Sequence, residues 1–235
     1  MFSTHTYKKI NKFVLYLFTF TLYSNTIQAQ CTAVSESDSL ALVEFYYAIG
    51  GDLLEQNGGW LEGPISEWTG ITLSDDGCSV KEINLLGQGL QGFIPDLNLP
   101  NLEVLNLSYN QLNNEIPNFS HLENLRTLNL TGSQLSGEIP DFSNLPNLKN
   151  LYLDENQLSG EIPDFSNLPN VLAIYLLGNQ LSGSIPDFPN LPSLKNLYLA
   201  DNQLSGEIPD FSNLPSLKIL GFYKNQLSGE VPNFS

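Results

Sequence analysis

The sequence predicts an α/β solenoid, in which short turns of chain stack into a rod with one parallel β-sheet along a concave side. Seven copies of one pattern fill residues 80–235, the last of them incomplete, and from the second copy on they recur every 23 residues. Each copy alternates leucine with variable residues, which is typical of a short strand with one buried face. Most copies continue into a glycine and a proline, which favour a mostly extended or 3-10 convex side over long helices.

Equivalent positions in successive copies form columns along such a rod, because every strand has the same register. One column is an apolar row in the core, and a second is an aromatic row on the far side of the core. A third carries asparagine just after the strand, where a buried amide can satisfy backbone groups as the chain leaves the sheet. In that order, the columns are Leu85, Leu107, Leu130, Leu153, Leu176, Leu199 and Phe222; Phe119, Phe142, Phe165, Phe188, Phe211 and Phe234; and Asn110, Asn156, Asn179, Asn202 and Asn225.

The consensus LxxLxxLxLxxNxLxGxIP resembles the plant-type leucine-rich repeat over about two thirds of the chain. This family is found in receptor ectodomains, cell-wall enzyme inhibitors and secreted bacterial proteins. The resemblance implies a right-handed superhelix and a recognition module rather than a chemistry. The Gln-Ala-Gln-Cys stretch at residues 28–31 is also similar to secreted proteins of Bacteroidetes-type bacteria.

Residues 1–30 have the layout of a secretory signal peptide, with three lysines followed by an apolar run and a small residue near the end. The apolar run is too short to span a bilayer. We therefore predict cleavage after Ala29 or Gln30 and a secreted or cell-surface protein without a membrane span.

Residues 31–79 are predicted to form an N-terminal cap that covers the first repeat. Residues 37–47 place apolar side chains at helical spacing behind a Ser or Asp N-cap, and a Gly-Gly pair ends this helix. Trp60 and Trp68 follow, and we interpret both as cover for the bare apolar end of the solenoid.

The two cysteines, Cys31 and Cys78, both lie in this cap. An even pair in an exported protein predicts a disulfide. Lipoprotein anchoring at Cys31 is the alternative. Gln30 argues against it, because a small residue normally precedes a lipidated cysteine.

Charge excludes several classes of partner. Once the signal peptide and its three lysines leave, six basic residues face 25 acidic ones, for a net charge of −19. Nucleic acid and anionic membranes are poor partners for that field. The charges form one basic and two acidic columns: Lys81, Arg126, Lys149, Lys195 and Lys218; Glu115, Glu138, Glu161, Glu207 and Glu230; and Asp96, Asp141, Asp164, Asp187 and Asp210.

We interpret the acidic columns as solvated surface. Calcium held between acidic rungs is the alternative, because hard cations take carboxylate oxygens. The chain has no D-x-D-x-D-G loop, so we predict neither a metal nor a cofactor.

The candidate binding site lies on the concave face, where variable residues between the strand leucines point outward. The column between the leucines changes from asparagine to tyrosine along the rod, and carboxylates stand beside the tyrosines. Tyrosine suits binding surfaces because it offers rigid area and a polar tip, although copying of a repeat produces the same column without a ligand. The candidate residues are Tyr109, Tyr152, Asp154, Glu155, Tyr175, Tyr198, Asp201, Tyr223 and Lys224.

The function predicted from these features is an exported, non-catalytic module that binds a protein or peptide on the concave face. Glycan or cell-wall polysaccharide binding through the tyrosines is the alternative. Catalytic residues are predicted to be absent, because the chain lacks nucleophile-elbow and zinc-protease motifs and a phosphate-binding glycine loop. Its carboxylates form regular columns, so we expect no single cleft that raises the pKa of one of them.

The last repeat stops at Asn233-Phe234-Ser235 without a polar capping unit. A bare terminal repeat exposes an apolar edge. We therefore expect either a fragment of a longer protein, which we favour, or self-association through this end.

Overall fold

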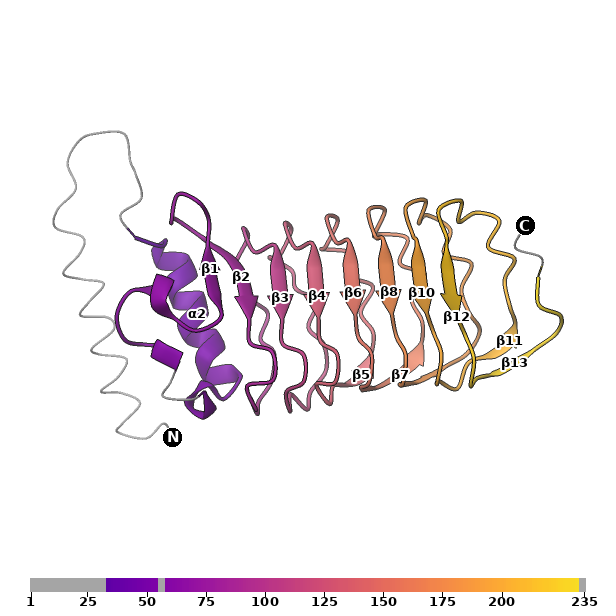
Figure 1. Cartoon of the computed structure of the whole chain (residues 1–235), viewed down its shortest axis with the longest axis horizontal. Helices are drawn as coiled ribbons and strands as arrows, with labels where there is room; N and C mark the ends of the chain where they lie inside the picture. Colours follow the sequence, from indigo (N-terminus) through magenta and orange to yellow (C-terminus); the bar gives the residue numbers. More distant parts are fainter. Residues whose placement is uncertain (1–32, 55–57, 233–235) are drawn as a thin grey trace.

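The computed structural model describes residues 33–54 and 58–232, which form a rod of stacked turns with a helical cap at the N-terminal end (Figure 1). The main sheet has the strand order β1-β2-β3-β4-β6-β8-β10-β12. Strands of successive repeats pair in parallel at equivalent residues, as predicted. The strands are β1 (Ile71–Leu73), β2 (Val80–Asn84), β3 (Val104–Asn106), β4 (Thr127–Asn129), β6 (Asn150–Tyr152), β8 (Ala173–Tyr175), β10 (Asn196–Tyr198) and β12 (Ile219–Gly221).

The Leu-Ser-Gly-Glu segments form two further parallel sheets, β5-β7-β9 and β11-β13, away from the main sheet (Figure 1). The glycine of each segment has a positive φ, near 80°. The glutamate stem of the preceding repeat lies against several of these glycines, so a side chain there would clash. The strands are β5 (Ser136–Glu138), β7 (Gln157–Glu161), β9 (Gln180–Ser182), β11 (Ser205–Glu207) and β13 (Gln226–Ser228).

The aromatic row is a buried stack, as predicted. Phe142, Phe165, Phe188 and Phe211 are stacked with ring centroids 6.3–6.5 Å apart. Each has a φ near 50°, in the left-handed region that bulky residues rarely adopt. The preceding aspartate supports this turn in three repeats, because Oδ1 of Asp141, Asp164 and Asp210 accepts a hydrogen bond from the serine amide that follows the phenylalanine. These aspartates of the acidic column therefore have a structural role.

The asparagine column is a hydrogen-bond ladder, which confirms its structural interpretation. The Nδ2 group of Asn156 donates to one backbone carbonyl of the preceding repeat and two of its own. Its Oδ1 accepts from two backbone amides of the preceding repeat. Gln88 and Ser133 replace asparagine in two repeats. The next residue in each of these, Gly89 or Gln134, adopts a positive φ, so the turn differs there.

The cap begins with α2 (Glu36–Ala48), and Oγ of its N-cap Ser35 accepts from the amide of Asp38. Asp38 is buried, and its Oδ2 accepts from the amide of Val80 at 2.8 Å, so the cap holds the first residue of β2. Two 3-10 turns, η1 (Gly51–Leu53) and η3 (Ile65–Glu67), lead to β1, which pairs antiparallel with β2. This antiparallel strand was not predicted. Within the described residues, 3-10 helix occurs in the cap rather than in the repeats.

Trp60 and Trp68 cover the end of the core, as predicted. Both are buried, and their rings stack with centroids 5.0 Å apart. Each indole donates to a backbone carbonyl of the cap. Cys78 is not free, but Cys31 lies outside the described residues, so their pairing stays a prediction. The predicted signal peptide, residues 1–30, also lies outside the described residues.

Apolar side chains are more exposed in the last described repeat than in earlier ones. Ile219 is 46% exposed and Val231 is 64% exposed. Leu217, Leu220 and Phe222 are only partly buried, whereas the equivalent leucines of the middle repeats are fully buried. Self-association through this end stays a prediction.

Candidate functional site

The column between the strand leucines has continuous register on the outer face of the main sheet. Asn84, Asn106 and Asn129 pair in turn, and Asn129 then pairs with Tyr152. Tyr152, Tyr175 and Tyr198 follow in register and end at Gly221. We call the face from β2 to β4 the asparagine half and the face from β6 to β12 the tyrosine half.

The three tyrosine rings of the tyrosine half lie close together along the rod: Tyr175 and Tyr198 are stacked, whereas Tyr152 is tilted by 50° to Tyr175. Their centroids are 5.0 Å apart from Tyr152 to Tyr175 and 4.5 Å apart from Tyr175 to Tyr198. A Cβ at Gly221 would lie 3.1 Å from the Tyr198 ring, so this glycine leaves room for the last ring. The rings of Tyr175 and Tyr198 therefore cover part of each other's faces, and all three tyrosines remain partly exposed to a ligand.

Most polar side-chain groups of Asn84, Asn106 and Asn129 are hydrogen-bonded within the asparagine half. Asn106 Nδ2 donates to Asn84 Oδ1 at 3.1 Å, and Asn106 Oδ1 accepts from the amide and hydroxyl of Ser108. Asn129 Oδ1 accepts from the amide of Thr131. These bonds occupy groups that a ligand would otherwise use.

Asp154 is a carboxylate with a raised pKa beside the tyrosines. Its pKa is raised from 3.8 to about 6, mainly by burial and also by the nearby Glu155, although a hydrogen bond from the amide of Leu177 opposes the shift. The regular columns therefore do not keep every carboxylate at its ordinary pKa, although Asp154 lines neither of the two grooves at the Ile-Pro segments. The regular column gave no sign of this shift in the sequence, because desolvation of a carboxyl depends on the side chains around it in that one repeat.

The residues that directly follow the second strand leucine form a second column, which is only partly exposed: Leu86, Ser108, Thr131, Asp154, Leu177, Ala200 and Tyr223. Ser108 and Ala200 are buried, whereas Leu86 and Tyr223 are exposed. Tyr223 is 61% exposed and lies on the repeat after the tyrosine stack. The second column therefore offers Asp154, Leu177 and Tyr223 rather than a continuous strip.

The residue two positions after the second strand leucine forms a turn column, in which the backbone is left-handed in every repeat. Glycine alternates with larger residues along this column, except that Asp201 is followed by Lys224, and each φ lies between 54° and 69°. Where glycine follows a larger residue, that residue lies over it: a Cβ at Gly132 would be 2.8 Å from the Tyr109 ring, and one at Gly178 would be 3.7 Å from Glu155. The column is Gly87, Tyr109, Gly132, Glu155, Gly178, Asp201 and Lys224.

The structure brings most of the predicted site residues together on the tyrosine half. Asp154, Glu155 and Asp201 lie on the same repeats as the stacked tyrosines or between them. Lys224 binds Asp201 through Nζ and Oδ2 at 3.1 Å. Tyr109 lies apart, because its turn follows β3 in the asparagine half, where it is 56% exposed.

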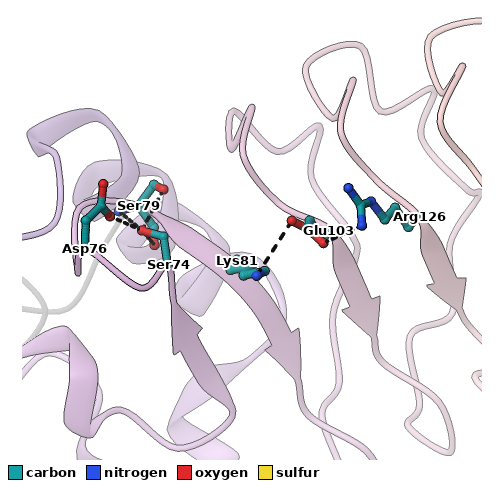
Figure 2. A network of polar contacts seen from close by, with 6 residues as sticks. All are labelled: Ser74, Asp76, Ser79, Lys81, Glu103 and Arg126. Carbon is teal, nitrogen blue, oxygen red and sulfur yellow. Dashed lines mark hydrogen bonds and ion pairs between the residues drawn. The ribbon is translucent and has the colours of Figure 1, made fainter.

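The basic column begins with an ion-paired group at the N-terminal end of the sheet (Figure 2). Glu103 and Leu172 take the two positions of this column that are not basic. The carboxylate of Glu103 lies 3.8 Å from Lys81 Nζ and 3.3 Å from Arg126 Nη1. The same view shows the turn between β1 and β2, where Ser74 Oγ donates to Asp76 Oδ1 at 2.6 Å.

The described residues contain no group of three or more His, Cys, Asp or Glu side chains arranged to hold a metal ion. Shallow grooves run between neighbouring repeats at the Ile-Pro segments. One of them is lined by residues 184–187 and 207–210. No described helix has the length and apolar character needed to cross a membrane.

Comparison with known proteins gives consistent matches. The family model "Leucine Rich repeats (2 copies)" matches residues 100–144 and 192–234, and the model "Leucine Rich Repeat" matches residues 147–168. A search of curated proteins found no match to this sequence.

Among solved structures, a pollen receptor kinase 3 structure is 36% identical, with a TM-score of 0.63, over 73% of this chain and 86% of that one. The PEPR1–AtPEP1 structure is 31% identical, with a TM-score of 0.77, over 84% of this chain and 29% of that one. The plant peptide hormone receptor RGFR1 in complex with RGF2 is 36% identical, with a TM-score of 0.58, over 60% and 24%. The chain thus spans less than a third of the length of these last two. With its stacked repeats, its asparagine ladder and these matches, the chain belongs to the leucine-rich repeat proteins.

Proposed function

We propose that this protein is a recognition module that binds an extended peptide, or an extended segment of a protein, on the tyrosine half of the main sheet. The observation that carries the proposal is the in-register row of Tyr152, Tyr175 and Tyr198, with ring centroids 4.5–5.0 Å apart. The stack offers rigid aromatic edges and a row of hydroxyl groups, which suit the alternating donors and acceptors of a peptide backbone.

The contrast with the asparagine half supports this location. There the exposed amides bond to one another and to the backbone, so a ligand gains little from them. In the tyrosine half the stack lies beside a partly buried carboxyl, Asp154, and ends near the exposed Tyr223. Aromatic residues with a few placed polar groups are the usual make-up of a protein-binding surface.

The solved structures also support peptide binding. PEPR1 was solved with AtPEP1, and RGFR1, a plant peptide hormone receptor, was solved with RGF2. The present chain is similar in fold to these receptors but much shorter, so the likeness supports the mode of binding and not a particular ligand.

Glycan binding through the same tyrosines is less favoured by the geometry. A sugar ring stacks on the open face of an aromatic ring. Here Tyr175 has a ring on both sides, and Tyr198 has Tyr175 on one side and the Gly221 backbone close by. We therefore prefer the peptide ligand.

Display of short random peptides against the folded protein tests the proposal. Peptides recovered on the wild type should bind a Tyr152→Ser/Tyr175→Ser/Tyr198→Ser variant at least about tenfold more weakly, because aromatic anchors carry much of the energy of such interfaces. The matched control is Asn84→Ser/Asn106→Ser/Asn129→Ser, which changes the same column in the other half and should bind within about twofold of wild type.

Equal loss of affinity in the two triple variants would overturn the proposal, as would unchanged affinity in the tyrosine variant. Circular dichroism melting of both variants shows whether either result comes from unfolding. A glycan array probed with the wild type provides the competing outcome: tyrosine-dependent binding to glycans with no peptide recovered would replace the peptide by a sugar.

We further propose that the module acts outside the cell. The predicted signal peptide supports this, as does likeness to a pollen receptor kinase and a peptide hormone receptor. The intact mass of the exported protein checks two features together, cleavage near Ala29 and loss of two hydrogens at Cys31 and Cys78. A mass that retains residues 1–30 would contradict export by this route.

A further inference from the structure

The basic residues of the described chain all lie near the ends of the strands of the main sheet. Beyond the predicted signal peptide the sequence has six of them against 25 acidic residues in the whole chain. Five lie at or just before the start of a strand of the main sheet, and Lys224 follows β12, the last strand of that sheet. A chain with so large an excess of acid therefore concentrates its positive charge on one surface.

Half of these basic residues have carboxylate partners. Lys81 and Arg126 both pair with Glu103, and Lys224 pairs with Asp201. The remaining three, Lys149, Lys195 and Lys218, are exposed, and among the described residues no carboxylate lies within 4.0 Å of their ammonium groups. We call these three the lysine row.

The lysine row borders the tyrosine half. Lys149 and Lys195 each lie three residues before a stacked tyrosine, and Lys218 lies three residues before Gly221. Glu155 and Asp201 occupy the turns at the other ends of the strands in the repeats of Lys149 and Lys195, and Lys224 occupies that turn in the repeat of Lys218 and pairs with Asp201. Across the tyrosine stack the surface therefore changes from unpaired lysines to Glu155 and an ion-paired Asp201.

The lysine row has an electrostatic cost without a compensating bond in the molecule. Strands of neighbouring repeats lie about 4.8 Å apart, so Lys195 and Lys218 are near neighbours, and Lys149 is two repeats from Lys195. Like charges at such spacing repel unless an opposite charge lies between them. At the other end of the same column Glu103 supplies that opposite charge, and in the tyrosine half nothing among the described residues does.

We infer that the lysine row supplies the anion-binding edge of the peptide site, and that the ligand carries acidic side chains along that edge. This inference rests on the proposed function, since it names the chemistry of the peptide that the tyrosine half binds. The ligand runs along the rod in an extended conformation. Its alternate side chains lie about 6.6 Å apart on one side, within reach of lysine side chains on successive repeats.

Synthetic peptides of alternating Glu and Ser test the inference directly, because alternation places every carboxylate on one side of an extended chain. The matched probe alternates Gln and Ser. Fluorescence anisotropy should show the Glu-Ser peptide binding wild type at least about tenfold more tightly than the Gln-Ser peptide, since several ion pairs form together. Added salt should reduce the difference.

Two variants with the same change in net charge separate local from overall electrostatics. Lys195→Gln/Lys218→Gln should remove most of the preference for the Glu-Ser peptide. Lys81→Gln/Arg126→Gln removes two paired charges in the asparagine half and should retain the preference. All four side chains lie at the surface, and melting curves confirm that both variants fold.

A wild type that binds the two peptides equally would overturn the inference, and so would equal losses in the two lysine variants. The proposed function fails separately. If displayed peptides bind through the tyrosines but are not acidic and ignore the lysine row, the function stands and the inference falls. If binding of the Glu-Ser peptide requires the lysine row while no ligand depends on the tyrosines, the lysine row is an anion-binding site and the proposed function is wrong.

Discussion

The asparagine and tyrosine halves of the main sheet share a backbone register but differ in what their side chains bond. In the asparagine half, Asn84, Asn106 and Asn129 occupy the same column as the tyrosines and bond to one another or to nearby backbone. In the tyrosine half the tyrosine rings pack against one another and stay partly exposed. The same scaffold therefore carries one surface whose polar groups bond to each other and one surface that is available to a ligand. The proposed function rests on this difference.

The largest expected effect tests whether the two halves have the same scaffold. Asn156→Ala, in the tyrosine half, and Asn110→Ala, in the asparagine half, should each lower the free energy of unfolding by about 3 kcal/mol, because buried backbone groups lose their partners. Urea denaturation measures both. An exposed control, Asn167→Ala, should change it by less than about 0.5 kcal/mol. A much smaller cost at Asn110 would show that the halves differ in their interior as well as on their surface.

The second prediction concerns Tyr109, the exposed tyrosine that lies outside the tyrosine half. Gly132→Ala should destabilise the protein by about 2 kcal/mol, because φ is +63° and the new Cβ would lie 2.8 Å from the Tyr109 ring. Gly87→Ala has the same φ and nothing within 4 Å, so it should cost about 1 kcal/mol for the backbone alone. Thermal melting compares the two. Equal costs would mean that Tyr109 moves freely and is not held by Gly132.

The smallest prediction concerns Asp154 in the tyrosine half. The equivalent positions of the asparagine half hold Ser108 and Thr131, which do not titrate. The pKa of Asp154 is raised from 3.8 to about 6, so the fold favours its neutral form. That stabilisation is complete below pH 3.8 and is lost as the pH rises through about 6.

Asp154→Asn stays neutral at every pH and keeps an oxygen to accept from Leu177. It should match wild type near the acid end of this range and exceed it by about 1 kcal/mol at neutral pH, after allowance for solvent screening. Urea unfolding at the two pH values is the measurement. Identical differences at both would show that Asp154 titrates normally.

The repeat period was enough to predict the columns, because a constant spacing forces equivalent residues into register. The asparagine ladder, the phenylalanine stack and the tyrosine row were all predicted on that basis. Features that depend on one rung or on the cap were not. The antiparallel strand β1 has no repeat to reveal it, and the burial of Ser108 and Ala200 depends on their particular neighbours.

The Asp154 shift could not be predicted for a related reason. Its column also holds Leu, Ser, Thr and Ala, and only the packed structure shows which side chains remove water from the carboxyl. The role of the aspartates that precede the buried phenylalanines was likewise hidden, because it depends on a left-handed backbone that the residue type does not suggest.

Alternation of glycine with larger residues in the turn column gives this edge a spacing twice that of the strands. Large side chains recur there at Tyr109, Glu155 and Asp201, two repeats apart, or about 9.6 Å. Three residues of extended chain span about 10 Å. The spacing of large side chains in the turn column thus matches every third residue of an extended chain. The strands beside this column repeat at about 4.8 Å, half that spacing. A peptide lying along the rod would therefore meet two different spacings, one at the strands and one at the turns.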